Sequence, residues 1–383
     1  MNVQSKRFYL LITIYFLLMH FASAQDAEYL IRVFNEHSEA VNTVAFSKSG
    51  KYMASGAEDK ALIIREINGE VIIKHKENYF AIKDIEFFGD KQLFVTAGKD
   101  VKLIDLENST LALYKGSSTH VWSFDFAPER NKLVAGSYDS KIKTWDVRTE
   151  EIELVLDGHN KSALSAAYSY DEKYIVSGSR DERIMIWNAK SGELMHSLER
   201  HSGNIYDIQF HPNTKYFASA SGDKTIRLWD IESAKVVKTY VGHESAVLDI
   251  EFSPDGYFMY SAGLDGVVFI WEVASGKKLY SYILHTGSVN SVAISNDGHY
   301  AATCGNDKKV MLWKSAKHIA VDLYFKDLLN AKKEMNNIFD DRRKGESRSD
   351  FNNRLNEAHL EELKLIDELF NKYIEKVNYK NIP

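Results

Sequence analysis

Histidine and aspartate residues recur in this sequence at a spacing that could bring them together in chemistry. Two sets repeat at intervals of 42 residues, the histidines His159, His201, His243 and His285 and the aspartates Asp181, Asp223, Asp265 and Asp307. Imidazole and carboxylate groups can act as general acid and base or bind a metal ion. Because each histidine and each aspartate belongs to its own copy of a repeat, we expect these residues to have a structural role in each copy and to form no shared active site.

The sequence contains none of the common catalytic motifs. We find no His-Glu-x-x-His, no Gly-x-Ser-x-Gly, no glycine-rich phosphate loop before a lysine and no cysteine cluster. The single cysteine, Cys304, is expected to be a small buried strand residue. The sequence therefore predicts no catalytic residues, no bound metal and no cofactor.

The repeat itself indicates the fold. Trp187, Trp229, Trp271 and Trp313 share the interval of 42 residues, and the pattern extends back to seven units that begin near residues 37, 78, 117, 159, 201, 243 and 285. The fifth unit contains four short strand patterns, at 205–210, 216–221, 225–229 and 236–240, separated by turn residues. Such units predict an all-β protein, a seven-bladed β-propeller of four-stranded antiparallel blades over residues 25–316.

Several dipeptides connect these units with a known family. Gly158-His159, Gly242-His243, Trp145-Asp146 and Trp229-Asp230 resemble the signature dipeptides of the WD-repeat family, and the resemblance covers about residues 27–316. It implies that the histidine binds the turn aspartate, while a Ser or Thr connects to the tryptophan. The implied sets are His159, Ser177, Asp181 and Trp187; His201, Ser219, Asp223 and Trp229; His243, Ser261, Asp265 and Trp271; and His285, Thr303, Asp307 and Trp313.

The first three units depart from this pattern, and we expect them to be less rigid. Arg65 stands in the tryptophan place of the first unit, and Ile104 in that of the second. Ser117 and Ala135 replace the His and the Ser of the third. A strand pattern at 29–34 precedes the first unit, and none follows the last tryptophan. The resemblance implies that this N-terminal strand completes the last blade.

In WD-repeat propellers, two recurring positions form the top face, which binds partners. One lies five residues after the histidine and the other directly before the turn aspartate. The third to sixth units provide, at these positions, the side chains of our predicted protein-binding surface: Trp122, Tyr138, Leu164, Arg180, Tyr206, Leu248 and Leu264. Clustered aromatic residues beside an arginine are typical of protein interfaces. Lys83 and Lys99 add a small basic sector.

The two ends of the sequence differ from the repeats. Residues 1–24 read as a secretory signal peptide, with Lys6 and Arg7 before an apolar stretch at 8–21 and small residues at 22–24. This predicts export to the periplasm or the extracellular space, with no membrane span after cleavage. The alternative is an uncleaved membrane anchor, although the apolar stretch is short for a spanning helix.

Residues 317–383 change to helical periodicity and predict a short α-helical hairpin. Tyr324, Leu328, Ala331, Met335 and Ile338 form one amphipathic stripe, and Leu355 to Val377 carry another. The hairpin could pack on itself or on the propeller, or act as a coiled-coil or partner-binding arm. The tail has slight similarity to charged helical tails of exported bacterial proteins.

The net charge and the composition argue against some classes of function. The formal net charge of −6 argues against a general phosphate-binding surface, so we expect no nucleic acid partner. We predict a non-enzymatic scaffold or adaptor that binds a protein or peptide on the top face, with a second contact through the tail. One alternative is an enzyme or small-ligand sensor that uses the central channel, against which the largely apolar top-face set argues. The other is a structural component of an envelope assembly.

Overall fold

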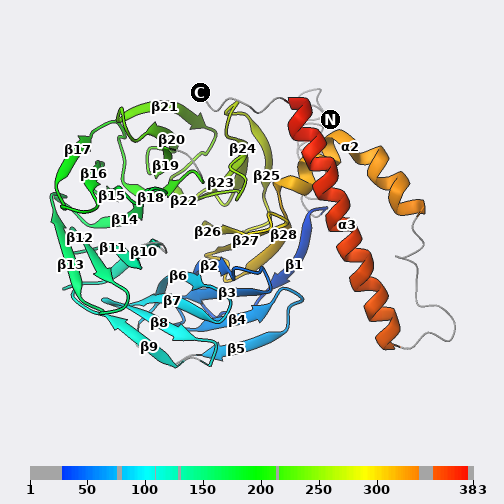
Figure 1. Cartoon of the computed structure of the whole chain (residues 1–383), viewed down its shortest axis with the longest axis horizontal. Helices are drawn as coiled ribbons and strands as arrows, with labels where there is room; N and C mark the ends of the chain where they lie inside the picture. The colour runs from blue at the N-terminus through cyan, green and yellow to red at the C-terminus, as the bar shows by residue number, and fades with distance from the viewer. Residues whose placement is uncertain are drawn as a thin grey trace, which may run out of the picture.

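A computed structural model describes residues 28–75, 80–107, 109–127, 131–212, 215–335 and 348–377. The predicted signal peptide and Asn78, at the start of the second unit, lie outside the described residues. Seven four-stranded antiparallel sheets are arranged radially around one axis, as Figure 1 shows. The predicted seven-bladed propeller is therefore confirmed.

Each blade begins at the axis and ends at the rim. The innermost strands are β2 (Val41–Phe46), β6 (Ile82–Phe88), β10 (Val121–Ala127), β14 (Ala163–Tyr168), β18 (Ile205–Phe210), β22 (Val247–Phe252) and β26 (Val289–Ile294). The second strands are β3 (Tyr52–Ala57), β7 (Gln92–Ala97), β11 (Lys132–Ser137), β15 (Tyr174–Ser179), β19 (Tyr216–Ser221), β23 (Phe258–Gly263) and β27 (Tyr300–Gly305). Because both faces of these second strands are covered by neighbouring blades, nearly all of their residues are buried.

The outer half of each blade has the same order. The third strands are β4 (Leu62–Glu66), β8 (Asp100–Asp105), β12 (Lys141–Asp146), β16 (Ile184–Asn188), β20 (Thr225–Asp230), β24 (Val268–Glu272) and β28 (Val310–Lys314). The rim strands are β5 (Val71–His75), β9 (Thr110–Tyr114), β13 (Ile152–Asp157), β17 (Leu194–Leu198), β21 (Lys235–Val241), β25 (Lys278–Tyr282) and β1 (Leu30–Phe34). We number the blades one to seven from β2 onward.

The N-terminal strand closes the ring. β1 pairs antiparallel with β28, with Arg32 opposite Leu312 and Phe34 opposite Val310. The last blade is thus built from both ends of the propeller sequence, as the family resemblance implied. Unfolding one end of the propeller therefore also removes a strand from the other end.

A hydrogen-bonded chain of four side chains stabilises each of blades four to seven. In blade five, the indole N–H of Trp229 donates to Ser219 Oγ at 2.8 Å, and His201 Nε2 lies 2.7 Å from the same oxygen. His201 Nδ1 lies 2.7 Å from Asp223 Oδ2. A carboxylate only accepts hydrogen bonds, so Nδ1 carries the proton and Nε2 accepts the serine hydroxyl. Each buried polar group of the chain is therefore satisfied.

The same chain occurs in the other three regular blades. Its members are His159, Ser177, Asp181 and Trp187 in blade four, His243, Ser261, Asp265 and Trp271 in blade six, and His285, Thr303, Asp307 and Trp313 in blade seven. The connectivity matches the one that the family resemblance implied.

Blades one and three replace missing members of the chain with ion pairs. Arg65, in the tryptophan place of blade one, is almost fully buried and donates two hydrogen bonds to Glu36, at 3.0 and 3.2 Å. Its guanidinium lies 4.1 Å from the centre of the Phe34 ring. In blade three, which lacks the histidine, Lys143 Nζ binds Asp139 at 2.7 Å. A polar partner for the turn aspartate is thus kept where the histidine is lost.

Two C-terminal helices follow the last blade, α2 (Ala316–Met335) and α3 (Arg348–Val377). They contact one another, and α3 packs along the edge of the disc at blades six and seven (Figure 1). Ile366, Phe370 and Tyr373 are buried there, and Tyr373 donates a hydrogen bond to Glu272 at 2.9 Å. Of the two interpretations of the tail, the structure supports the one in which it packs on the propeller.

Removing the central hydroxyl of one chain tests its contribution to stability. Ser219→Ala leaves Trp229 Nε1 and His201 Nε2 buried without a partner, and an unsatisfied buried group costs about 1–3 kcal/mol. We expect the free energy of unfolding to fall by about 2–4 kcal/mol, measured by urea denaturation followed by tryptophan fluorescence. The matched control, Ser202→Ala in the same blade, alters an exposed side chain and should change stability by less than about 0.5 kcal/mol. Equal effects of the two substitutions would contradict this role.

Candidate functional site

A small irregularity repeated in every blade places side chains at one end of the central channel. The pairing of each innermost strand with the second strand shifts by one residue near its start, for example between Ile205 and Asp207 in blade five. Such a β-bulge leaves one residue unpaired and redirects its side chain. The bulge residues are Asn42, Lys83, Trp122, Leu164, Tyr206, Leu248 and Asn290. They are the first of the two top-face positions inferred from the sequence.

The predicted top-face residues do not all have the same exposure. Trp122, Tyr206 and Leu248 are partly exposed and line the mouth of the channel together with Leu264, which is 52% exposed. Leu164 differs, because its side chain is fully buried. The expectation that it offers surface to a partner is therefore wrong, although it has the same bulge position as Trp122.

Tyr138 and Arg180 stand directly beside Trp122. The rings of Trp122 and Tyr138 meet edge to face, with centroids 5.4 Å apart. The guanidinium of Arg180 lies 4.9 Å from the Tyr138 ring centre and donates a hydrogen bond to its hydroxyl at 3.3 Å. Such contacts order large side chains before any partner arrives, which lowers the entropy lost on binding.

Lys83 extends this cluster toward blade one. Its ammonium lies 5.2 Å from the Trp122 ring centre and forms an ion pair with Glu58. Glu58 also accepts a hydrogen bond from the Asn42 amide at 3.0 Å. A continuous line of contacts therefore runs from blade one to blade four on the top face. Lys99, the other predicted basic residue, is exposed.

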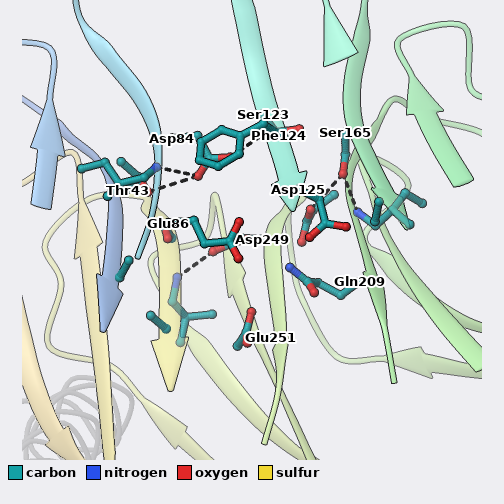
Figure 2. A pocket seen from close by; sticks show the side chains of 18 of the residues that line it. Thr43, Asp84, Glu86, Ser123, Phe124, Asp125, Ser165, Gln209, Asp249 and Glu251 are labelled. Carbon is teal, nitrogen blue, oxygen red and sulfur yellow. Dashed lines mark hydrogen bonds between the residues drawn. The ribbon is translucent and has the colours of Figure 1, made fainter. Parts of the chain in front are cut away.

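The channel contains a cavity of about 1320 Å³ that is lined by several acidic residues. Figure 2 shows carboxylates from several blades around it. They are Asp84 and Glu86 of β6, Asp125 of β10, Asp207 of β18, and Asp249 and Glu251 of β22. The sequence analysis missed these residues. These acids lie six or eight residues after the start of a unit, which is one or three positions beyond the first top-face position. Counting along the innermost strand from that position would have found them.

The channel aspartates connect neighbouring blades. Each accepts a hydrogen bond from a backbone N–H of the next innermost strand. The pairs are Phe124 N to Asp84 Oδ2 at 3.1 Å, Tyr168 N to Asp125 Oδ2 at 2.7 Å, Ile250 N to Asp207 Oδ2 at 3.2 Å, and Val292 N to Asp249 Oδ2 at 2.7 Å. Ser165 Oγ accepts the equivalent bond from Ile208 N at 3.0 Å. This set of contacts fixes the distance between blades at the axis.

Enclosure in the channel raises the pKa of its acids. Burial raises the pKa of Asp84 to about 7 and that of Asp125 to about 6. Burial, and then repulsion from Asp207 and Asp125, raises the pKa of Glu251 to about 8. The pKa is raised by burial in the same way for Glu86, Asp207 and Asp249. Several of these acids therefore hold a proton near neutral pH.

Within the described ranges, no group of three or more His, Cys, Asp or Glu residues is placed to hold a metal ion. Cys304 is fully buried, and burial raises the pKa of its thiol well above the usual value, so the thiol is protonated. No helix in the described part of the chain is long and apolar enough to cross a membrane.

The raised pKa of Glu251 predicts a pH-dependent effect of Glu251→Gln. The unfolded chain loses this proton near pH 4.3, whereas the folded protein keeps it up to about pH 8. Folding is therefore progressively penalised as pH rises between these values. We expect the variant to gain about 1 kcal/mol or more over the wild type at pH 8.5 and clearly less at pH 5.0, measured by urea denaturation at both values.

Comparing the stability of the variant with that of the wild type at the same pH separates the effect of Glu251 from that of the blade histidines. Burial lowers the pKa of His201, so the stability from its neutral form is lost as pH falls below about 6.5. That loss is the same in the wild type and the variant. Glu107→Gln, an exposed control, should change stability equally little at both pH values. A gain from Glu251→Gln that does not depend on pH would show that the carboxyl has an ordinary pKa.

Individual relatives resemble parts of the chain. Actin-interacting protein 1 of Drosophila melanogaster is 30% identical over 151 residues, which cover 37% of this chain and 25% of the relative. The WD repeat domain-containing protein 83 homolog of Dictyostelium discoideum is 29% identical over 129 residues, covering 32% and 39%. The general transcriptional corepressor TUP1 of Saccharomyces cerevisiae is 23% identical over 175 residues, covering 40% and 24%. The matches thus span well under two thirds of each relative.

The family model described as "WD domain, G-beta repeat" matches six segments of the chain, at 28–65, 108–146, 150–188, 192–230, 234–272 and 276–314. These segments cover more than half of the sequence. The stretch between the first two holds most of blade two, in which Asn78 and Ile104 replace the signature histidine and tryptophan, yet the structure shows four strands there. On the sequence match and the seven-bladed structure together, this chain belongs to the WD-repeat family.

Proposed function

We propose that this protein is a scaffold that binds another protein or a peptide over the mouth of its channel. The observation that carries the proposal is the contiguous cluster of Trp122, Tyr138 and Arg180, with Lys83 beside it. Large aromatic residues and arginine supply most of the binding energy at protein interfaces. Their mutual contacts hold these side chains in place at the bulge of β10 and at the turns that follow β11 and β15.

The position of the C-terminal helices supports the proposal that the partner binds on the top face. α2 and α3 lie at the outer edge of blades six and seven, so they leave the top face around Trp122 uncovered (Figure 1). Among the relatives, Actin-interacting protein 1 is named for its interaction with a protein. That name supports a protein-binding role for the fold and says nothing about actin as a partner of this chain.

Paired substitutions at the mouth test the proposal. Proteins retained by the immobilised wild type would be identified by mass spectrometry, and the dissociation constant of the purified partner would be measured by calorimetry. Trp122→Ala with Tyr206→Ala should weaken binding by at least tenfold, because truncated hot-spot residues commonly cost 2 kcal/mol or more. The thermal unfolding midpoint should change by only a few degrees.

Tyr170→Ala is the matched control. Tyr170 is 66% exposed and follows the innermost strand of blade four, near the opposite end of the channel. Its loss should leave the affinity within twofold of the wild type. If the mouth variant binds as tightly as the wild type, or if the Tyr170 variant loses binding equally, the partner does not use the predicted surface.

We also propose that the protein acts outside the cytoplasm, on the basis of residues 1–24 alone. Signal peptidase cleavage after the small residues at 22–24 would leave Gln25 as the first mature residue. N-terminal sequencing of the protein purified from a secreting host should begin at Gln25. A mature chain that still begins at Met1 would contradict export by cleavage and favour an anchor or retention inside the cell.

A further inference from the structure

Two buried histidines meet where the propeller joins the C-terminal helices. His299 lies in the turn between β26 and β27, and His318 lies in the first turn of α2. The two residues are only 3% and 4% exposed. Their rings meet edge to face, with centroids 5.4 Å apart, and His299 Nδ1 lies 3.3 Å from His318 Nε2. The contact therefore connects blade seven with the start of the tail.

The helix α3 adds an acid to this pair. Asp367 Oδ2 lies 3.3 Å from His299 Nε2, and Lys317 Nζ of α2 binds the other oxygen of Asp367 at 2.8 Å. A carboxylate only accepts hydrogen bonds, so His299 Nε2 carries the proton and donates it. His299 Nδ1 is then an acceptor, to which His318 Nε2 donates. With both rings neutral, the hydrogen bonds between blade seven, α2 and α3 are thus satisfied.

The turn of α3 that carries Asp367 also makes the apolar contact with the propeller. Phe370 packs against Phe258 and Tyr257 of blade six, with ring centroids 5.9 and 6.2 Å apart. Ile366 is buried in the same cluster. Because these side chains are neighbours on one helix, the polar contact and the apolar contact must separate together. We call the arrangement in which both are made the docked form of α3.

A charge on His299 is unfavourable in the docked form. Burial, and then the ammonium of Lys317, lower the pKa of His299 below its ordinary value, against the attraction of Asp367 and Asp297. A second proton, on Nδ1, also turns the acceptor of the His318 bond into a donor. Without α3 the ring would regain water, and its pKa would return toward its ordinary value of about 6.5. The docked form is therefore the form that binds fewer protons.

We propose that His299 and His318 make the docking of α3 sensitive to pH, so that mild acid loosens the helix from blades six and seven and uncovers the apolar surface beneath it. A pKa that docking lowers gives a stabilisation that is fully present above the undocked value. That stabilisation is lost as pH falls below about 6.5. Repulsion between the two rings adds to the loss once both are protonated.

Other ionisable groups surround the pair on every element packed against it. They are Asp297, Tyr300 and Lys314 of blade seven, Lys317 of α2, His359, Glu362 and Asp367 of α3, Asp255 and Tyr260 of blade six, and Lys48 and Lys51 in the adjacent turn of blade one. His359 is exposed and lies 2.6 Å from the Tyr300 hydroxyl. An exposed ring is solvated in both forms, so His359 should contribute little to the pH dependence.

Hydrogen exchange of the full chain measures the docking of α3. Amide exchange would be followed by mass spectrometry at pH 7.5 and 5.5, with each rate divided by the rate of an unstructured peptide at the same pH. The resulting opening constant is the ratio of undocked to docked molecules. For the segment 360–373 of the wild type, we expect this constant to rise about threefold or more from pH 7.5 to pH 5.5.

Two variants assign the effect to the buried pair. His299→Gln/His318→Gln keeps groups that can form hydrogen bonds but removes both titrating rings, so its opening constant should change by less than 1.5-fold. His359→Gln, the matched control at the same interface, should rise like the wild type. Single His299→Gln serves in place of the double variant if that variant does not keep α3 docked at pH 7.5, and it should lose at least half of the rise.

The wild type also gives an independent measurement. The pKa of His299, read from its imidazole resonances by NMR, should lie below 6.5 in the wild type. It should move toward 6.5 in Phe370→Asp, which places a charge in the apolar contact and undocks α3. An opening constant that changes by less than 1.5-fold in the wild type, or rises equally in the double variant, would overturn the proposal. An equal rise in the strands of blade six would also overturn it, because acid would then loosen the whole propeller and not the tail.

Discussion

The structure depends on the hydrogen-bonded chain that links a tryptophan, a serine or threonine, a histidine and an aspartate within a blade. It joins the turn before the first strand, the second strand, the following turn and the third strand. A buried chain of this kind has one satisfied arrangement, so it fixes those segments relative to one another. The residue before the turn aspartate is thereby held on the top face. The position of the proposed binding surface is in part a geometric consequence of the groups that stabilise the blades.

In the irregular blades, other polar side chains take the place of missing members of the chain. A blade therefore needs buried polar partners at these places more than it needs particular residue types. Arg65 pairs with Glu36 in blade one, and Lys143 pairs with the turn aspartate in blade three. Both are ion pairs, in which a cationic side chain takes the place of a member of the regular chain and desolvation of the charges offsets part of their attraction. The top-face cluster of Trp122, Tyr138 and Lys83 lies on blades two and three. Part of the proposed binding surface therefore lies where the repeat is least regular, while Arg180 and Tyr206 extend it onto the regular blades four and five.

The sequence was sufficient to predict the fold because every blade of a propeller repeats the same local structure. The seven copies of a repeat with an interval close to 42 residues give the number of blades, and the strand patterns give their order. The ring closure followed from a missing strand at one end and an extra strand at the other. The exposure of individual side chains could not be predicted from the repeat. Leu164 and Trp122 have the same bulge position, but only one is accessible, because the cover of each side chain comes from other blades. The channel acids were missed for a related reason, since their meeting at the axis is a property of the whole ring.

The acids of the channel fall into two groups with different physical roles. Asp84, Asp125, Asp207 and Asp249 each bind a backbone N–H of the next blade, so the ring uses them as connectors. The aspartates therefore have a structural reason to lie at the axis. Glu86 and Glu251 have no such bond, and their longer side chains reach into the space that the aspartates enclose. A carboxylate that is placed beside other carboxylates without a partner weakens the fold. The blade architecture does not require these two glutamates, and burial raises their pKa, so each holds a proton in the channel more readily than a free glutamate does.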